Sequence, residues 1–219
     1  MKKRVRMAID IIMVILMLLL MAYSLVGEEL HEIAGVAMFV CFAIHQILNR
    51  GWYKALFKGR YTPQRIIRTV INILLLVVII LQPISGIMMS KHLFTFIQVR
   101  GISAISREVH LMLAYWAFVL MSMHAGTHIR QPKGRAGTII SIIAAAVSIY
   151  GIYAFIKRGF PGYMFGTMKF AFFDFSEPRV FFFLDYIAIM ILFATVGAAL
   201  IYLTSRKKGA YKCRQSRIT

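Results

Sequence analysis

Histidine is the residue of this sequence whose type and spacing could support redox or metal chemistry. His31 and His45 are 14 residues apart, and the spacing from His110 to His124 is the same. Fourteen residues make two heptads, so both members of each pair face the same side of a helix in a left-handed bundle. At 1.5 Å per residue they lie about 21 Å apart along the helix axis. Each segment therefore presents an imidazole at two levels.

These two levels predict a pair of stacked haem b sites. If both segments run in the same direction, His31 lies opposite His110, and His45 lies opposite His124. Two axial imidazoles hold a low-spin iron and leave no open position for oxygen chemistry, so such a centre carries electrons. An ionisable side chain inside a membrane span is also a functional hypothesis by default, because its burial there is costly.

Two further histidines leave alternatives open. His128 lies one turn beyond His124, so it could replace His124 as a ligand or bond a haem propionate or a quinone. His92 lies just outside an apolar run, and we expect it not to ligate iron. A lone membrane histidine can equally serve only to hydrogen-bond a neighbouring helix, so the matched spacing of two pairs is what favours ligation.

The residues between the paired histidines suit a flat macrocycle. Small residues let it approach the backbone closely, and Met or Phe can pack on its face or edge. The positions on the same faces are Gly35, Met38 and Phe42 in one segment and Ala114, Ala117 and Met121 in the other. Candidate cations for the haem propionates are Arg50, Arg68 and Arg130 on the inner side and Lys91, Arg100 and Arg107 on the outer side. Taken singly, each cation is better explained as an interfacial anchor.

The elements that must position these histidines are membrane helices. Of the 219 residues 60% are hydrophobic and 16% charged, and the mean hydropathy is +0.74. This composition excludes an ordinary soluble domain and a disordered chain. The net charge of +18 does not indicate a nucleic-acid binder, because the basic residues lie in short clusters between apolar runs. A spanning helix needs about 20 apolar residues. Six runs suit this length, at 8–26, 33–48 (from 31 with its polar first turn), 70–89, 109–129, 137–156 and 181–204.

We therefore predict an all-α polytopic membrane protein with six transmembrane helices and both termini cytoplasmic. Residues 1–219 would form a single transmembrane cytochrome b-like domain, with haem-ligand helices at about 31–50 and 107–129. The second and fourth helices would run in the same direction, because one span lies between them. On adjacency alone, the first and third helices would complete a haem-binding four-helix bundle.

The charge distribution supports this orientation. Of the 26 Lys and Arg residues, 19 lie in the segments that this topology places in the cytoplasm, as the positive-inside rule requires. Seven of the eight acids lie on or near the outer side, and the eighth, Asp10, begins the first helix. His31 and His110 are then at the outer level, and His45 and His124 at the inner level.

Little of the chain remains outside these runs. The longest connection, 157–179, is rich in aromatic residues, and we expect it to lie in the outer interface. Cys41 and Cys213 fall in different compartments and cannot form a disulfide framework. The sequence has no GxGxxG, Walker or CxxC motif, so a nicotinamide or flavin donor domain would have to be a separate protein.

Several short motifs resemble the flavinylation-associated cytochrome domain family. They are His31-Glu32-Ile33-Ala34-Gly35 through His45, the stretch 48–59, Arg107-Glu108-Val109-His110 with Tyr115-Trp116 and His124, and the aromatic-acidic segments 172–175 and 183–186. The resemblance covers nearly the whole chain. It implies a small cytochrome b of the bacterial plasma membrane, associated with extracytoplasmic proteins that carry covalent flavin.

The function we expect is transmembrane electron transfer through two haem b groups. The donor would be a membrane quinol or a cytoplasmic flavoprotein, and the acceptor an extracytoplasmic, flavin-bearing protein. One alternative is a ferric or quinone reductase that uses the same haems and a substrate pocket near the outer loops. Another is a non-redox membrane subunit, in which Gln82-Pro83 and Ser85-Gly86 break a helix beside a polar cavity. A Pro kink packed by neighbouring helices is the simpler explanation of that motif.

Overall fold

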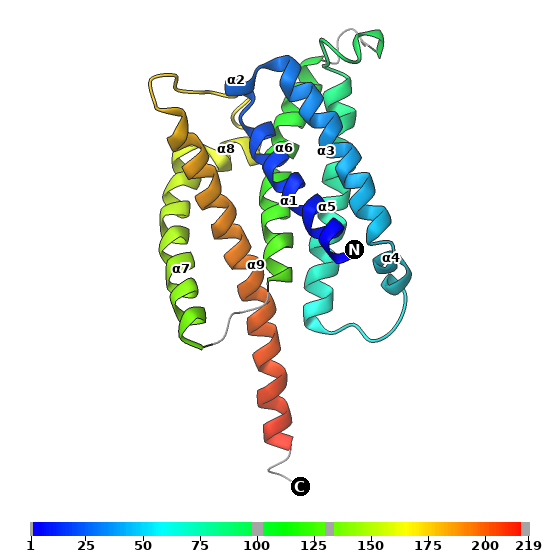
Figure 1. The fold of residues 1–219 in the computed structure, drawn as a ribbon, viewed down its shortest axis with the longest axis vertical. Coiled ribbons are helices and arrows are strands. Elements are labelled where there is room, and N and C mark those ends of the chain that lie inside the picture. The colour runs from blue at the N-terminus through cyan, green and yellow to red at the C-terminus, as the bar shows by residue number, and fades with distance from the viewer. Residues whose placement is uncertain (1, 98–102, 130–133, 216–219) are drawn as a thin grey trace.

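The computed structural model describes residues 2–97, 103–129 and 134–215, and every regular element in these ranges is a helix (Figure 1). The predicted all-α class is therefore confirmed. The helices, in chain order, are α1 (Lys2–Met21), α2 (Tyr23–Val26), α3 (Glu28–Leu48), α4 (Gly51–Leu56), α5 (Pro63–Ile87), η1 (Thr95–Ile97), α6 (Ser103–His128), α7 (Gly134–Lys157), α8 (Phe160–Met164) and α9 (Arg179–Gln215).

Five of the helices in the described ranges are long and apolar enough to cross a membrane, so the chain is a multi-pass membrane protein. They are Glu28–Leu48, Pro63–Ile87, Ala104–His128, Gly134–Lys157 and Arg179–Ser205. The predicted first span, 8–26, is not among them. It forms α1 and the short α2, which are separated at Ala22, and α1 carries four basic residues and Asp10 in its first half.

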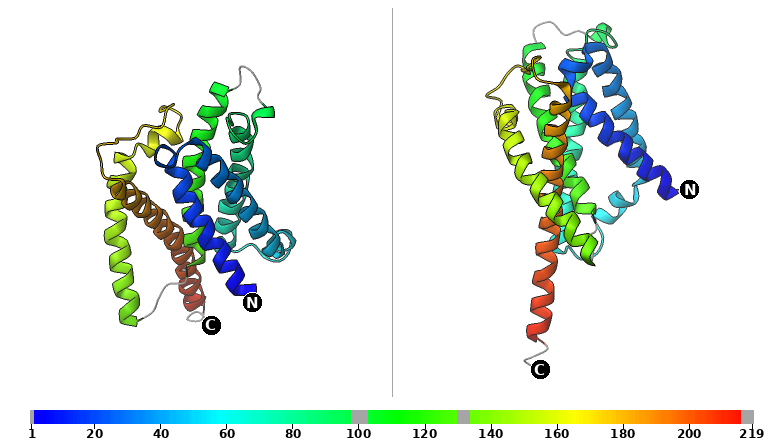
Figure 2. Two further views of the ribbon diagram at one scale, coloured as in Figure 1. Left: turned by 45° about the horizontal axis from the view of Figure 1, so that its top comes forward. Right: turned by 60° about the vertical axis from the view of Figure 1, so that its left-hand side comes forward.

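The helices pack in two groups. In one group α9 lies between α7 and α6, and α5 packs on the other side of α6; in the other, α1 packs against α3 (Figure 2). Gly27, with a φ of 83°, turns the chain between α2 and α3. Arg6 at the start of α1 donates to the carbonyl of Leu48 at the end of α3 (2.7 Å). The two helices of this pair therefore run antiparallel.

Glycine allows the closest contacts in the larger group. A β-carbon added to Gly126 of α6 would lie 2.0 Å from the carbonyl oxygen of Ala194 in α9, and one added to Gly197 would lie 2.3 Å from the carbonyl oxygen of Met123. The same holds for Gly151 of α7 against α9. Small residues at such positions are the usual means by which membrane helices approach one another. These contacts fix α6, and hence its histidines, against α9.

Apolar side chains cover the outward faces of the membrane helices. Ile142 and Ile149 of α7 are 62% and 72% exposed, and Val77 of α5 is 49% exposed. In water, exposed apolar surfaces of this kind would promote aggregation, whereas in a bilayer they contact lipid hydrocarbon without a free-energy penalty. The exposed apolar faces thus agree with a membrane environment.

The connection 157–179 only partly lies where the sequence suggested. Phe165 and Phe172 are more than 70% exposed, as expected for an interfacial segment. Phe160 of α8 is completely buried, and Tyr163 stacks on Tyr115 of α6 at a centroid distance of 4.3 Å. Gly159, with a φ of 67°, turns α8 back into the bundle, so this half of the connection belongs to the core.

Candidate functional site

Two pairs of histidines face each other between α3 and α6. The ring centroids of His31 and His110 are 6.1 Å apart with an interplanar angle of 69°. Those of His45 and His124 are 6.5 Å apart with an angle of 75°. We call His31 with His110 the upper pair and His45 with His124 the lower pair, after the ends of α3 at which they lie in Figure 1. The structure thus brings together the four histidines that the spacing had paired.

Packing between the two levels keeps the pairs apart. Met38 of α3 and Ala117 and Met121 of α6 are all less than 10% exposed and belong to the hydrophobic core. They occupy the helix faces between the histidines, as the sequence indicated. Gly86 of α5 makes room for the upper pair, because a β-carbon there would lie 3.2 Å from His110 Cε1.

The hydrogen bonds of His110 define which of its ring nitrogens carries the hydrogen. His110 Nδ1 lies 3.1 Å from Ser85 Oγ and 3.2 Å from the Gln82 carbonyl oxygen. The Ser85 hydroxyl itself donates to that carbonyl (2.8 Å), so both neighbours act as acceptors and Nδ1 donates. The Nε2 lone pair is then free to accept, and it takes the Gln82 side-chain amide at 3.2 Å. His31 Nδ1 is buried without a hydrogen-bond partner among the described residues.

His45 is held by a carboxylate. Its Nδ1 lies 2.8 Å from Asp10 Oδ1 of α1, and the side chains of His45 and Asp10 are 22% and 55% exposed. An ionised carboxylate only accepts hydrogen bonds, so His45 donates from Nδ1 and keeps the Nε2 lone pair free. Carboxylate–imidazole pairs of this kind orient histidines that ligate metals.

The partner of His124 is Asn72 of α5, whose amide fits in two orientations. In one, Oδ1 accepts from His124 Nδ1 at 2.7 Å. In the other, the amide nitrogen donates to His124 Nδ1 and to the Arg68 carbonyl (3.1 Å), and the oxygen accepts from Trp52 Nε1 (3.3 Å). The second orientation satisfies more groups in the protein alone. In the first orientation His124 carries its hydrogen on Nδ1, which leaves the lone pair of Nε2 free to bind a metal.

His128 lies beside the lower pair. Its ring centroid is 4.9 Å from that of His124, while the ring facing His45 is that of His124. Arg68 of α5 donates from Nη2 to the carbonyl of Thr127 (2.9 Å), and its Nε is buried without a partner among the described residues. A buried guanidinium donor of this kind fits a carboxylate ligand.

The separation of the rings in both pairs suits two imidazoles that bind one metal ion. A metal–imidazole bond is about 2 Å long and the ring centre lies about 1 Å further on, so two rings that share one metal have centres about 6 Å apart. Both measured separations agree with this value. No three histidine, cysteine or carboxylate side chains in the described ranges converge on a bare metal ion. A porphyrin supplies four ligands itself, so two imidazoles suffice.

The structure gives less support for a role of the other candidate site residues. A β-carbon at Gly35 would point toward α1, with Leu20 Cδ2 at 4.0 Å. Arg50 is exposed at the start of α4. Arg130 and Arg100 lie outside the described residues. His92 lies in the loop after α5, where its Nε2 is 3.8 Å from Glu28 Oε2.

Sequence reasoning did not assign the groups that hold the histidines. Asp10, Asn72, Gln82 and Ser85 come from α1 and α5 and contact three of the four paired histidines. Asp10 is the one acid inside the first apolar run, and an acid within a membrane span is a signal of function that could have identified it. Asn72 and Gln82 are single polar residues in a strongly apolar helix and carried a weaker form of that signal.

A second polar cluster lies at the upper end and connects α7 to α9. Asp185 of α9 is fully buried and pairs with Arg158 (2.7 Å) and Lys157 (3.1 Å), and it accepts from the hydroxyl of Tyr150. Glu177 pairs with the same two cations, at 2.7 Å from Lys157 and 2.6 Å from Arg158. Two acids therefore balance two cations. Asp185 therefore has its charge compensated by cations of α7 and of the turn that follows it.

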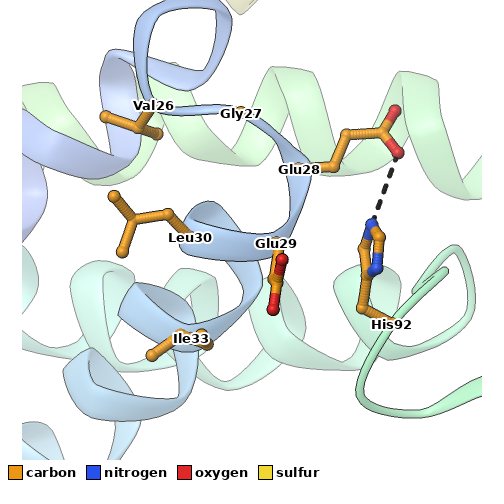
Figure 3. Close-up of a pocket in the computed structure, with 7 residues that line it drawn as sticks. All are labelled: Val26, Gly27, Glu28, Glu29, Leu30, Ile33 and His92. Carbon is orange, nitrogen blue, oxygen red and sulfur yellow. Dashed lines mark ion pairs between the residues drawn. The ribbon is translucent and has the colours of Figure 1, made fainter.

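The surface at the upper end is hollowed beside the start of α3. The hollow has a volume of about 530 Å³ and is lined by Val26, Gly27, Glu28, Glu29, Leu30, Ile33 and His92 (Figure 3). Tyr23 connects it to the upper pair. Its hydroxyl donates to Glu28 (3.0 Å), and its ring lies edge-on to His31 at 5.2 Å.

Comparisons of the chain with protein-family models, with curated proteins and with solved structures found no match.

Proposed function

We propose that this protein carries electrons across a membrane through two bis-histidine haem b sites, one at each histidine pair. The observation that carries the proposal is that two imidazole pairs lie one above the other between the parallel helices α3 and α6. In each pair the ring centres are separated by the distance expected for two imidazoles that bind one metal. A haem iron with two axial imidazoles exchanges single electrons and has no free position for a substrate. Two such sites at different depths suit transfer across the bilayer better than a single-site enzyme.

The chain's own residues would hold and orient the groups. His31 with His110, and His45 with His124, would hold the iron of each group through imidazole nitrogens. Asp10 accepts from Nδ1 of His45, and Ser85 Oγ and the Gln82 carbonyl accept from Nδ1 of His110, so both rings keep their hydrogen on Nδ1. The Gln82 amide bonds His110 Nε2 in this structure, and it would have to release that nitrogen for a metal to be held there. The buried Nε of Arg68 suits a propionate of the lower group.

In this proposal α1 is the sixth span and both termini are cytoplasmic. At 20 residues α1 is about 30 Å long, enough for the hydrocarbon core. Its antiparallel packing on α3 and the Arg6–Leu48 bond at the lower end support a crossing. The basic first turns would then lie in the cytoplasmic headgroups, as the positive-inside rule expects.

The partners follow from chemistry and from the family resemblance. The donor is a quinol or a cytoplasmic flavoprotein at the lower end. The acceptor is an extracytoplasmic protein that carries flavin, as in the bacterial plasma-membrane systems that the sequence resembles. The basic segments of the lower end suit an acidic donor through electrostatic steering, although their anchoring role accounts for most of that charge.

The test is the dithionite-reduced minus oxidised spectrum of membranes that contain the full chain, followed by haem quantitation on the purified protein. We expect the bands of low-spin haem b and two haems per chain. A colourless protein from cells supplied with a haem precursor would end the proposal and leave the non-redox subunit. One haem per chain would contradict the two-site arrangement.

The hollow beside α3 favours a quinone reductase as the second candidate. It combines apolar walls with His92, whose ring N–H could donate to a quinone oxygen, and Glu28, whose carboxylate could accept from a quinol hydroxyl, and Tyr23 links it to the upper pair. Steady reduction of a water-soluble quinone by the purified haem-loaded protein, with an artificial donor and no flavoprotein, would support this candidate. The variant Glu28→Gln should slow that reaction, and an unchanged rate would remove the hollow from the mechanism.

A further inference from the structure

The two histidine pairs differ in the charge of the groups that hold them. His45 of the lower pair donates to the carboxylate of Asp10 at 2.8 Å. His110 of the upper pair bonds a hydroxyl and a backbone carbonyl, from Ser85 and Gln82, and both are neutral. An anion is therefore in direct contact with one pair only.

The acids of the upper end do not cancel this difference. Glu28 is neutralised by Lys91 (2.6 Å) and also accepts from Tyr23. Glu32 accepts from the hydroxyl of Ser90 (2.7 Å) and from three backbone N–H groups of the loop that follows it. Neither carboxylate hydrogen-bonds a ring of the upper pair: Glu28 is paired with Lys91, and the oxygens of Glu32 accept from the Ser90 hydroxyl and the loop N–H groups.

The cations of the lower end do not neutralise Asp10 either. Among the described residues no lysine or arginine lies within ion-pair distance of it, and His45 is its one ionisable partner. Arg6 bonds the carbonyl of Leu48, and Arg68 bonds the carbonyl of Thr127. The carboxylate of Asp10 is therefore in direct contact with His45 and with no cation among the described residues.

We propose that Asp10 is a positioning residue for His45 and makes the lower site the one of lower reduction potential, so that transfer from the lower site to the upper site is the downhill step between them. This inference rests on the proposed function. A carboxylate that accepts from Nδ1 makes the imidazole a more basic ligand, and a more basic ligand stabilises the oxidised iron. Hydrogen bonds from this shell are one of the means by which a protein sets a haem potential. One electron leaves the lower site and one arrives at the upper site, with no proton exchanged and no bond broken.

The order of the two potentials suits a donor at the lower end and an acceptor at the upper end. The lower end carries the basic segments that the sequence places in the cytoplasm, so the donor is cytoplasmic or reaches the inner leaflet. The acceptor then meets the upper end, beside α2, the hollow and the loop after α5.

The experiment is spectroscopic redox titration of the haem-loaded full chain. The upper site is measured alone in His45→Ala and the lower site alone in His31→Ala. In the unmodified protein we expect the lower site to titrate at the lower potential. Asp10→Asn, which keeps the size and removes the charge, should shift the lower site upward and leave the upper site in place. Glu108→Gln, which removes an exposed acid paired with Lys169 (2.9 Å), should shift neither.

Each result decides the question. A lower site at equal or higher potential than the upper one, or an Asp10→Asn variant that holds both haems at unchanged potentials, overturns the inference. If Asp10→Asn loses only the lower haem, Asp10→Glu must restore it at low potential, and failure to do so overturns the inference. A chain that binds no haem refutes the proposed function instead. A haem-independent readout is the ¹⁵N shift of the His45 ring, which should report Nδ1–H in the unmodified chain and change in Asp10→Asn.

Discussion

Gly86 of α5 lies directly against the imidazole of His110, so that a β-carbon at position 86 would come within 3.2 Å of His110 Cε1. The two residues therefore set the position of the upper pair together. Gly86→Ala should push the ring out of line with His31, and Gly86→Leu should displace it fully. An overpacked site typically costs about 1–3 kcal/mol. We expect haem content to fall from two toward one per chain, with the lower site retained.

The control for this prediction is Gly51→Ala in α4, where no atom lies within 4 Å of the new β-carbon. That variant should keep both haems. Two fully occupied sites in Gly86→Leu would mean that the upper pair is not used. Gly35→Ala tests separately whether a haem lies against Gly35, as the sequence predicted. The new β-carbon would meet the nearest protein atom at 4.0 Å, so a loss of haem in this variant would mean that a bound group lies against that face.

The lower pair should be separable from the upper pair by substitution. His45→Ala and His124→Ala each remove one of two axial nitrogens, so each should cost one haem and leave the upper one spectrally intact. Quantitation of haem per chain measures this. His92→Ala, in the loop after α5, should keep two haems. Equal loss of both haems from either lower-pair variant would show that the sites are not independent.

The role of His128 is decided by the same measurement. Its ring lies tilted beside that of His124 and does not form the ring pair with His45. His128→Ala should therefore retain two haems. If it loses one while His124→Ala loses none, His128 is the ligand and the 14-residue spacing misassigned it.

Stability should depend on pH through the cluster that connects α7, α9 and the connection before α9. Hydrogen bonds from Lys157 and Arg158 hold the pKa of Glu177 below the ordinary value for a glutamate. A lowered pKa contributes stability above the unfolded value, and that stability is lost as the pH falls through the folded value. We expect thermal stability in detergent to decline below about pH 4.3. Because Glu177 is partly exposed, its share should be about 1 kcal/mol or less.

Glu177→Gln isolates this contribution. The variant should be less stable than the unmodified chain at pH 7, and the difference should shrink as the pH falls below 4. A difference that stays constant from pH 7 to pH 3 would contradict an ionised, paired Glu177. Melting temperatures of the two proteins across this range make the comparison.

Much of the site could be predicted because it depends on helix periodicity alone. A span of two heptads fixes the face and the axial distance of two residues on one helix, and the topology fixes the relative depth on the next. The partners of the histidines depend on how far each neighbouring helix is rotated about its own axis. No local pattern encodes that rotation, so Asp10 and Asn72 became partners only in three dimensions.

The errors in the fold prediction have similar causes. The segment that contains Pro161 and Gly162 has the composition of a loop, so the sequence did not indicate that Phe160 would be buried. Phe160 is buried because its ring contacts α6 and α9. The predicted run at 70–89 began late, because the amphipathic first turns of α5 extend back to Pro63. There Thr62 accepts from the N–H of Arg65 (3.4 Å). Helix α5 also continues through Pro83, as the kink explanation required.

The angle between facing rings makes a last prediction, which concerns the electronic state of both sites. The imidazole planes of the two pairs are 69° and 75° apart. Parallel planes donate into the same iron d orbital and separate it in energy from its perpendicular partner, whereas crossed planes leave the two orbitals nearly equal. Nearly equal orbitals give a highly anisotropic low-spin ferric signal with one large g value.

We expect electron paramagnetic resonance of the oxidised protein to show this signal from both sites, and His31→Ala to remove one component. An ordinary rhombic low-spin signal from either site would mean that its rings turn parallel when iron binds, and that the protein does not impose the crossed arrangement.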